Sequence, residues 1–253
     1  PSARGATMRR AIASSRILAL PAFALMALLA VSCGASVELA IGAGGSASIG
    51  LGVEVPPAVE ARIRRFTASA GAAASAPLFD AAAVSGAVRA RGATVDSSRA
   101  PTTGSYRGSF RAADLTALIA GTEGLGAALD YRRAPGRASL AFRLDRTTAP
   151  ALVGLFPGID AELLESLQPP ALYDNPVSIA EYRSMLAGLL GQAALSVIDG
   201  QALELRVTLP GPVLELSGAA KAAPGGRSVS ISVPALEAMV LAEPVAFRVE
   251  WSE

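Results

Sequence analysis

The side chains that carry most enzymatic chemistry are nearly absent from this chain. Its 253 residues include no histidine, one cysteine (Cys33) and one lysine (Lys221). Without histidine, a Ser-His-Asp or Cys-His centre and a histidine-ligated metal are excluded. One cysteine excludes an internal disulfide, a CxxC redox pair and a thiolate metal cage. We therefore expect no metal, no cofactor and no enzymatic activity, since an enzyme would have to work with hydroxyl, carboxylate and arginine side chains or with Lys221.

Two further groups have a spacing that could do chemistry. Asp160, Glu162 and Glu165 lie on a predicted short helix, where Glu162 and Glu165 share a face that could bind calcium or act as acid and base. Acids in a first helical turn also cap free N–H groups and favour the helix dipole, and we prefer this structural explanation. The glycines of 42–52 and 124–126 resemble parts of a phosphate loop. Neither lies between a buried strand and a helix, so turns are the better interpretation.

The N-terminal part of the sequence has the order of an export leader. The segment 8–16 is basic because it contains Arg9, Arg10 and Arg16 and no acid, and residues 17–31 form a run without any charge. As a helix this run would be about 22 Å long, which is shorter than a hydrocarbon core of about 30 Å, and Pro21 interrupts it. A basic start, a short apolar middle and small residues at the end indicate an exported protein. Met8 is a better candidate for the start of translation than any of residues 1–7.

The leader ends at the single cysteine. The residues at this point are Leu29, Ala30, Val31, Ser32 and Cys33. This order resembles a bacterial lipobox, in which the cysteine thiol receives a diacylglyceryl group and the leader is cut just before it. Ala30 departs from the pattern, where leucine is more usual. The alternative is a plain secretory signal or an uncleaved anchor in which Cys33 is incidental.

These signals divide the chain into three parts. We expect a removed export signal over 1–32, a lipidated cysteine with a very short tether over 33–36, and a single α+β domain over 37–253. From Cys33 on, 18 basic and 21 acidic residues remain, a net charge of −3. This charge argues against a nucleic-acid partner, because nucleic-acid binders present a basic surface. We expect a lipid-anchored protein of the bacterial cell envelope, on the periplasmic face or at the cell surface.

Strand patterns dominate both ends of the predicted domain. Between residues 37 and 55, apolar residues alternate with small or polar ones on both sides of a glycine turn, which predicts a hairpin with one buried face. The same alternation predicts strands over 106–110, 129–131, 140–144, 203–209, 214–216, 229–233 and 245–251. Helices are expected after Pro57, over 80–91, after a capping Asp114, and from 148 and 160. A further helix is expected after Ser178, which forms a capping box with Glu181. The sum is an α+β fold, a mostly antiparallel β-sheet with helices packed on one face.

Two groups of residues are candidates for contact with a lipid. Arg62 and Arg65 lie on one face of the helix predicted after Pro57, where they could contact headgroups near the anchor; the alternative is a solvated helix face. A second group could line an apolar ligand cavity, or else form an ordinary core: Ser178, Met185, Leu186, Leu189, Leu190 and Trp251. We interpret the uncharged run 184–198 as a core helix running into a loop.

Several segments resemble known envelope lipoproteins. The lipobox, the hairpin 37–55 and the segments 167–172, 181–183 and 244–251 resemble spirochaete-type bacterial envelope lipoproteins, a group with no assigned activity. A lipobox followed at once by a β-hairpin is also similar to LppM-like lipoproteins, whose domain is linked to lipid binding. The resemblance implies a membrane-anchored, non-enzymatic protein that binds lipid or another amphiphile. The alternative is a structural or assembly lipoprotein that docks an envelope protein through a sheet edge or an apolar patch.

Overall fold

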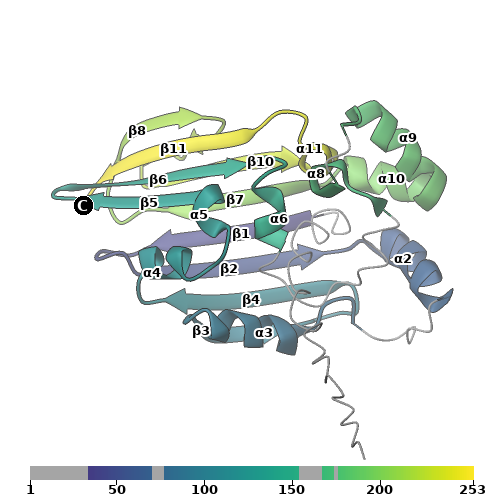
Figure 1. Ribbon diagram of the computed structural model, residues 1–253, viewed down its shortest axis with the longest axis horizontal. Coiled ribbons are helices and arrows are strands. Elements are labelled where there is room, and N and C mark those ends of the chain that lie inside the picture. The colour runs from purple at the N-terminus through teal and green to yellow at the C-terminus, as the bar shows by residue number, and fades with distance from the viewer. Residues whose placement is uncertain (1–33, 70–76, 154–166, 174–175) are drawn as a thin grey trace, which may run out of the picture.

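The computed structural model describes residues 34–69, 77–153, 167–173 and 176–253. The leader, the lipobox with Cys33 and the carboxylate cluster at 160–165 lie outside these residues, and the predictions made there stay predictions. The described chain forms two β-sheets with helices at one end and along one side (Figure 1). The α+β class with mostly antiparallel pairing is confirmed. The strands divide into two sheets, however, where we expected one.

The larger sheet has seven strands in the order β3-β4-β2-β1-β7-β10-β9. Its strands are β1 (Gly34–Ile41), β2 (Ala47–Glu54), β3 (Thr94–Arg99), β4 (Ser105–Ala112), β7 (Ala202–Thr208), β9 (Lys221–Ala222) and β10 (Ser228–Pro234). Neighbouring strands are antiparallel except at the centre, where β1 and β7 run parallel. The parallel pair joins the first strand of the described chain to a strand far along the sequence, so the centre of the sheet forms only when both are present.

The period-two alternation of the sequence decides which face of this sheet is buried. Leu39 in β1, Leu51 in β2 and Val207 in β7 are buried, whereas Glu38 and Arg206 on the opposite face are exposed. Successive side chains of a strand point to opposite faces, so one face becomes apolar and the other polar. The predicted hairpin with one buried and one wet face is confirmed as β1 and β2.

The smaller sheet has four antiparallel strands in the order β5-β6-β11-β8. They are β5 (Leu129–Ala134), β6 (Arg137–Leu144), β8 (Val213–Gly218) and β11 (Val245–Ser252). A hydrophobic cluster joins the two sheets, with Leu39 and Val207 from the larger one and Leu140, Val249 and Trp251 from the smaller one. The rings of Tyr131 and Trp251 stack within it, with centroids 6.1 Å apart.

The first strand begins earlier than the sequence pattern indicates. Gly34 pairs with Glu54 and Ala35 pairs with Val53, so β1 extends over residues 34–36, which we had assigned to a tether. Glycine, alanine and serine at these positions give a weak strand pattern, and the ladder with β2 and the parallel contact to β7 supply the pairing instead.

Three helices lie together beyond one end of the strands (Figure 1). They are α2 (Pro57–Ser69), α9 (Ile179–Leu190) and α10 (Gln192–Asp199). Their exposed surface is called the helical end below. Their inner sides pack on the short helix α11 (Ala235–Val240) and on the ends of the strands, forming a second hydrophobic cluster with Ile63, Tyr182, Leu186 and Leu195. Helix α8 (Pro170–Tyr173) packs against α11 and the first cluster. The loop predicted after α9 is in fact helix α10.

The remaining helices lie along the sheets. They are α3 (Ala81–Ala90), α4 (Leu115–Ala120), α5 (Leu125–Ala128) and α6 (Ala149–Val153). Asp114 caps α4 as expected, and Asp80, which we had placed inside the helix 80–91, caps α3; each accepts two backbone N–H groups at the helix start. Within the described ranges, no helix has both the length and the apolar character needed to cross a membrane.

Candidate functional site

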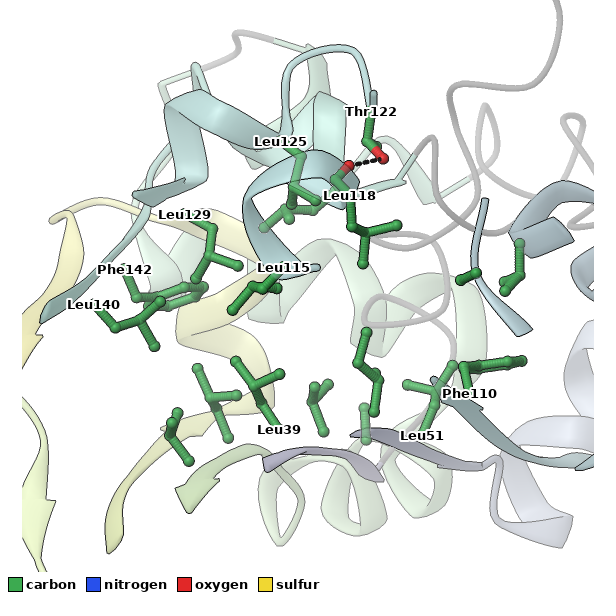
Figure 2. A pocket seen from close by; sticks show the side chains of 18 of the residues that line it. Leu39, Leu51, Phe110, Leu115, Leu118, Thr122, Leu125, Leu129, Leu140 and Phe142 are labelled. Carbon is green, nitrogen blue, oxygen red and sulfur yellow. Dashed lines mark hydrogen bonds between the residues drawn. The ribbon is translucent and has the colours of Figure 1, made fainter. Parts of the chain in front are cut away.

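An apolar cavity of about 210 Å³ lies between the two sheets. The larger sheet contributes one wall, which includes Leu39 and Leu51, and the smaller sheet contributes Leu140 and Phe142. Helices α4 and α5 cover it with Leu115, Leu118 and Leu125. Figure 2 shows these side chains facing one another from the two sides with open space between them.

The cavity explains an irregularity in the burial of the two sheets. Val37, Leu205 and Phe142 follow the alternation that points side chains into the core, yet they are only half-buried. All three line the cavity, so their exposed area faces this internal space. The covering helices are short, six residues in α4 and four in α5, and therefore carry few side chains to fill the space.

Only two of the described lining residues carry a polar side chain. The Thr122 hydroxyl donates to the carbonyl oxygen of Leu118 over 2.8 Å, drawn as a dashed line in Figure 2. The Arg91 guanidinium donates from Nη1 to the carbonyl oxygen of Ala87 over 2.9 Å. The described lining therefore has no carboxylate and no nucleophile paired with a base. Such a surface suits an apolar group rather than acid-base chemistry.

The residues we predicted to line a cavity lie elsewhere. Ser178 and Glu181 form the expected capping box of α9, and Leu186 and Leu190 are buried in the cluster beneath that helix. Trp251 is fully buried between the sheets. The described cavity wall includes none of the predicted residues, Met185 and Leu189 among them. Of the two interpretations given for these residues, the ordinary core holds for Leu186, Leu190 and Trp251, and the cavity lining does not.

The two arginines singled out in the sequence lie at the helical end. Arg62 and Arg65 are exposed on α2 and are not among the cavity residues. Arg64 between them forms an ion pair with Glu60 at 2.7 Å. The Nη2 of Arg62 lies 3.3 Å from the position that a Cβ would take at Gly191, where α9 meets α10. Their contact with lipid headgroups stays a prediction.

One carboxylate outside the cavity has a strongly shifted pKa. Burial alone would raise the pKa of Asp145, but hydrogen bonds from the Thr147 hydroxyl, from the backbone N–H groups of Thr147 and Thr148 and from Arg143 outweigh it and lower the pKa well below the usual range. The network closes the turn between β6 and α6, so its role is structural. The described residues hold no group of three or more acidic or cysteine side chains arranged to bind a metal.

No family model matches this chain, and a search of curated proteins finds no significant match. One solved structure that resembles it is the folded domain of LppM from Mycobacterium tuberculosis, determined by NMR. The identity is 12%, the TM-score is 0.38, and the alignment covers 86% of this chain and 88% of that one. This is a weak LppM-like similarity, and the comparisons give no support to the spirochaete-type resemblance.

Proposed function

We propose that this protein is a non-enzymatic, membrane-anchored envelope lipoprotein that holds the apolar part of an amphiphile in the cavity between its two sheets. The observation that carries this proposal is the cavity itself, with aliphatic and aromatic side chains on both sides. Well-packed cores contain few voids larger than a water molecule. An apolar space of this size is therefore costly unless a ligand fills it.

The volume limits the size of the ligand. An engineered apolar cavity of about 150 Å³ binds benzene, and sites for drug-sized ligands measure roughly 300–1,000 Å³. At about 210 Å³, the space fits part of one acyl chain or a small ring system. A ligand with two long chains would leave most of its apolar surface outside.

The first test is mass spectrometry on organic extracts of the purified full-length chain. A ligand in the cavity is extracted, whereas a chain bonded to a cysteine thiol stays with the protein. We expect one single-chain amphiphile in about equal amount to the protein. The reference is Leu205→Trp, which places an indole ring in the cavity. If the wild-type chain and this variant release the same small amount of lipid, the cavity is not a binding site.

Anchoring through Cys33 needs its own test. Metabolic labelling with a palmitate analogue should label the wild-type chain and leave Cys33→Ser unlabelled. The variant should also migrate as the larger, uncut form, since the leader is expected to be cut only after lipidation. A single acyl chain gives marginal membrane binding and two or more make it durable. Equal labelling of both chains would contradict the lipobox.

The alternative, a scaffold that docks a protein partner, has less support. It needs an exposed apolar patch or an open sheet edge. Leu214 in the edge strand β8 is 55% exposed, but singly exposed apolar residues are common on soluble proteins. In the extraction experiment, a stable chain that carries no amphiphile would favour this alternative.

A further inference from the structure

We propose that the helical end is a membrane-docking surface that lies against anionic lipid. This inference concerns a different surface from the cavity, and it holds whether or not the cavity carries a ligand. It rests on where the chain enters the domain, on an uncharged stretch of two helices, and on two arginines beside that stretch.

The chain enters the domain at the helical end. Gly34 pairs with Glu54, the last residue of β2, and α2 starts three residues later. The neighbouring Ala35 pairs with Leu203, four residues after α10 ends. A Cβ at Gly34 would lie 2.8 Å from Oε1 of Gln201, which separates α10 from β7. Residues 1–33 therefore join the domain beside α2 and α10, and a lipid on Cys33 would hold this end at the membrane.

The surface of α9 and α10 is suited to a lipid interface. No charged residue occurs between Ser184 and Ile198, a stretch that covers the second half of α9 and most of α10. Met185 is 38% exposed there, one of the few large apolar side chains that the described surface exposes to this degree, and Leu189 is half-buried nearby. An uncharged surface with a flexible apolar side chain can enter the headgroup region at little desolvation cost.

The charges at the helical end favour an anionic partner. Glu60 pairs with Arg64 on α2, and Asp199 of α10 pairs with Arg183 of α9 at 2.6 Å. The third acid, Glu181 of α9, is bonded to Ser178 in the capping box, so the three helices carry four arginines against three acids. Arg62 and Arg65 form no ion pair with any described residue. The guanidinium of Arg62 lies beside Gly191, so a positive charge borders the uncharged surface at the α9–α10 junction.

The two arginines should contribute measurably to the affinity for an anionic bilayer. Each basic residue near an anionic bilayer contributes on the order of 1 kcal/mol to binding, which is about a fivefold change in affinity. Removing both arginines should therefore weaken docking about 25-fold. The partner that fits is a bilayer surface with anionic headgroups, since it offers many phosphates to the arginines and an apolar region to Met185.

Met185 supplies a probe that needs no label. Dilute peroxide converts exposed methionine to the sulfoxide, which mass spectrometry counts residue by residue. The full-length chain would be reconstituted in vesicles of phosphatidylcholine alone and of phosphatidylcholine mixed with phosphatidylglycerol. We expect Met185 to oxidise several times more slowly on the mixed vesicles. Met239, which is buried, should oxidise slowly on both and reports that the fold is intact.

Two double variants separate docking from net charge. Arg62→Gln with Arg65→Gln should return the oxidation of Met185 on mixed vesicles to the rate seen on phosphatidylcholine. Arg107→Gln with Arg206→Gln removes the same charge from the exposed face of the larger sheet and should keep the protection. The proposal is wrong if Met185 oxidises equally fast on both vesicles, or if the two double variants lose protection equally. If no amphiphile is extracted from the cavity, the conclusion drawn from the oxidation of Met185 does not change.

Discussion

The hydroxyl of Tyr182 donates a hydrogen bond to the carbonyl oxygen of Leu167 over 3.0 Å, and both residues are buried. Tyr182 comes from the first turn of α9, and Leu167 lies three residues before the start of α8. Burial raises the pKa of Tyr182, so the hydroxyl keeps its proton and remains a donor. The bond ties α9 to the core that the helical end covers.

This bond predicts that Tyr182→Phe destabilises the fold by about 1–2 kcal/mol, because the variant loses the bond and leaves a buried carbonyl unsatisfied. Tyr131 is the matched control. Its hydroxyl is buried without a hydrogen-bond partner among the described residues, so Tyr131→Phe should change the free energy of unfolding by less than about 0.5 kcal/mol or raise it. Urea denaturation of both variants measures the difference. Equal losses would show that the bond to Leu167 contributes nothing.

Asp145 predicts how stability depends on pH. Its pKa in the folded chain lies below the unfolded value of about 3.9, so the unfolded state binds more protons and stability rises with pH in this range. The contribution, on the order of 2 kcal/mol, should be complete above about pH 5 and fade as the pH falls through 4 and below. Asp145→Asn should therefore lower stability at neutral pH and much less at acid pH.

The exposed ion pair of Asp130 with Arg132 serves as the control for this experiment. Asp130→Asn should cost less than about 1 kcal/mol at neutral pH, because exposed pairs contribute little. Thermal unfolding of the wild-type chain and both variants across pH 2–7 gives the comparison. Parallel stability curves for the wild-type chain and Asp145→Asn would contradict the assigned role of Asp145.

Local signals in the sequence predicted the elements that depend on neighbouring residues. The capping box of Ser178 and Glu181 and the cap Asp114 appear as expected, because a cap involves residues within one turn. The hairpin of β1 and β2 follows from strict alternation around a glycine turn. These features need no information from distant parts of the chain.

Elements that depend on distant partners were missed. Strand β3 has a single aliphatic residue, Val95, and exists because β4 pairs with it across a bulge. The division into two sheets was missed for the same reason, since β6 pairs with β11 about a hundred residues away. Alternation shows which face of a strand is buried, but it does not identify the neighbouring strand.

The cavity could not be predicted from the sequence either. Alternation correctly assigned Leu39, Leu51 and Leu205 to an inner face. Whether opposing side chains meet or leave a space depends on the separation of the sheets and on the helices that cover them. The stripe of α9 left two interpretations open, a cavity lining and a packed core, because an apolar helix face has the same pattern in both.

Two glycines predict opposite effects of the same substitution. Gly218 has a φ of +87°, and a Cβ there would collide with the carbonyl oxygen of Ala246, so Gly218→Ala should cost about 2 kcal/mol or more. Gly86 lies inside α3, and beyond the backbone of the helix itself no atom lies within 4 Å of an added Cβ, so Gly86→Ala should stabilise by about 0.5–1 kcal/mol. Melting temperatures test both. A loss at Gly86 would mean that α3 is not helical at that position.

Filling the cavity tests the proposed ligand site most directly. Val37 is half-buried and lines the cavity, so the ring of Val37→Phe can occupy space that a ligand would need. Binding of a fluorescent fatty acid should weaken at least about tenfold, since a hydrophobic site that loses the room for a few carbons loses the matching contacts. Stability should fall by less than the 1–3 kcal/mol typical of overpacking, because the ring enters existing space.

Val213 is also half-buried but lies outside the cavity lining, and Val213→Phe should leave the affinity unchanged. Equal affinities for all three chains would place the ligand elsewhere, whereas equal losses in both variants would indicate general disruption of the fold, since Val37 belongs to the larger sheet and Val213 to the smaller one.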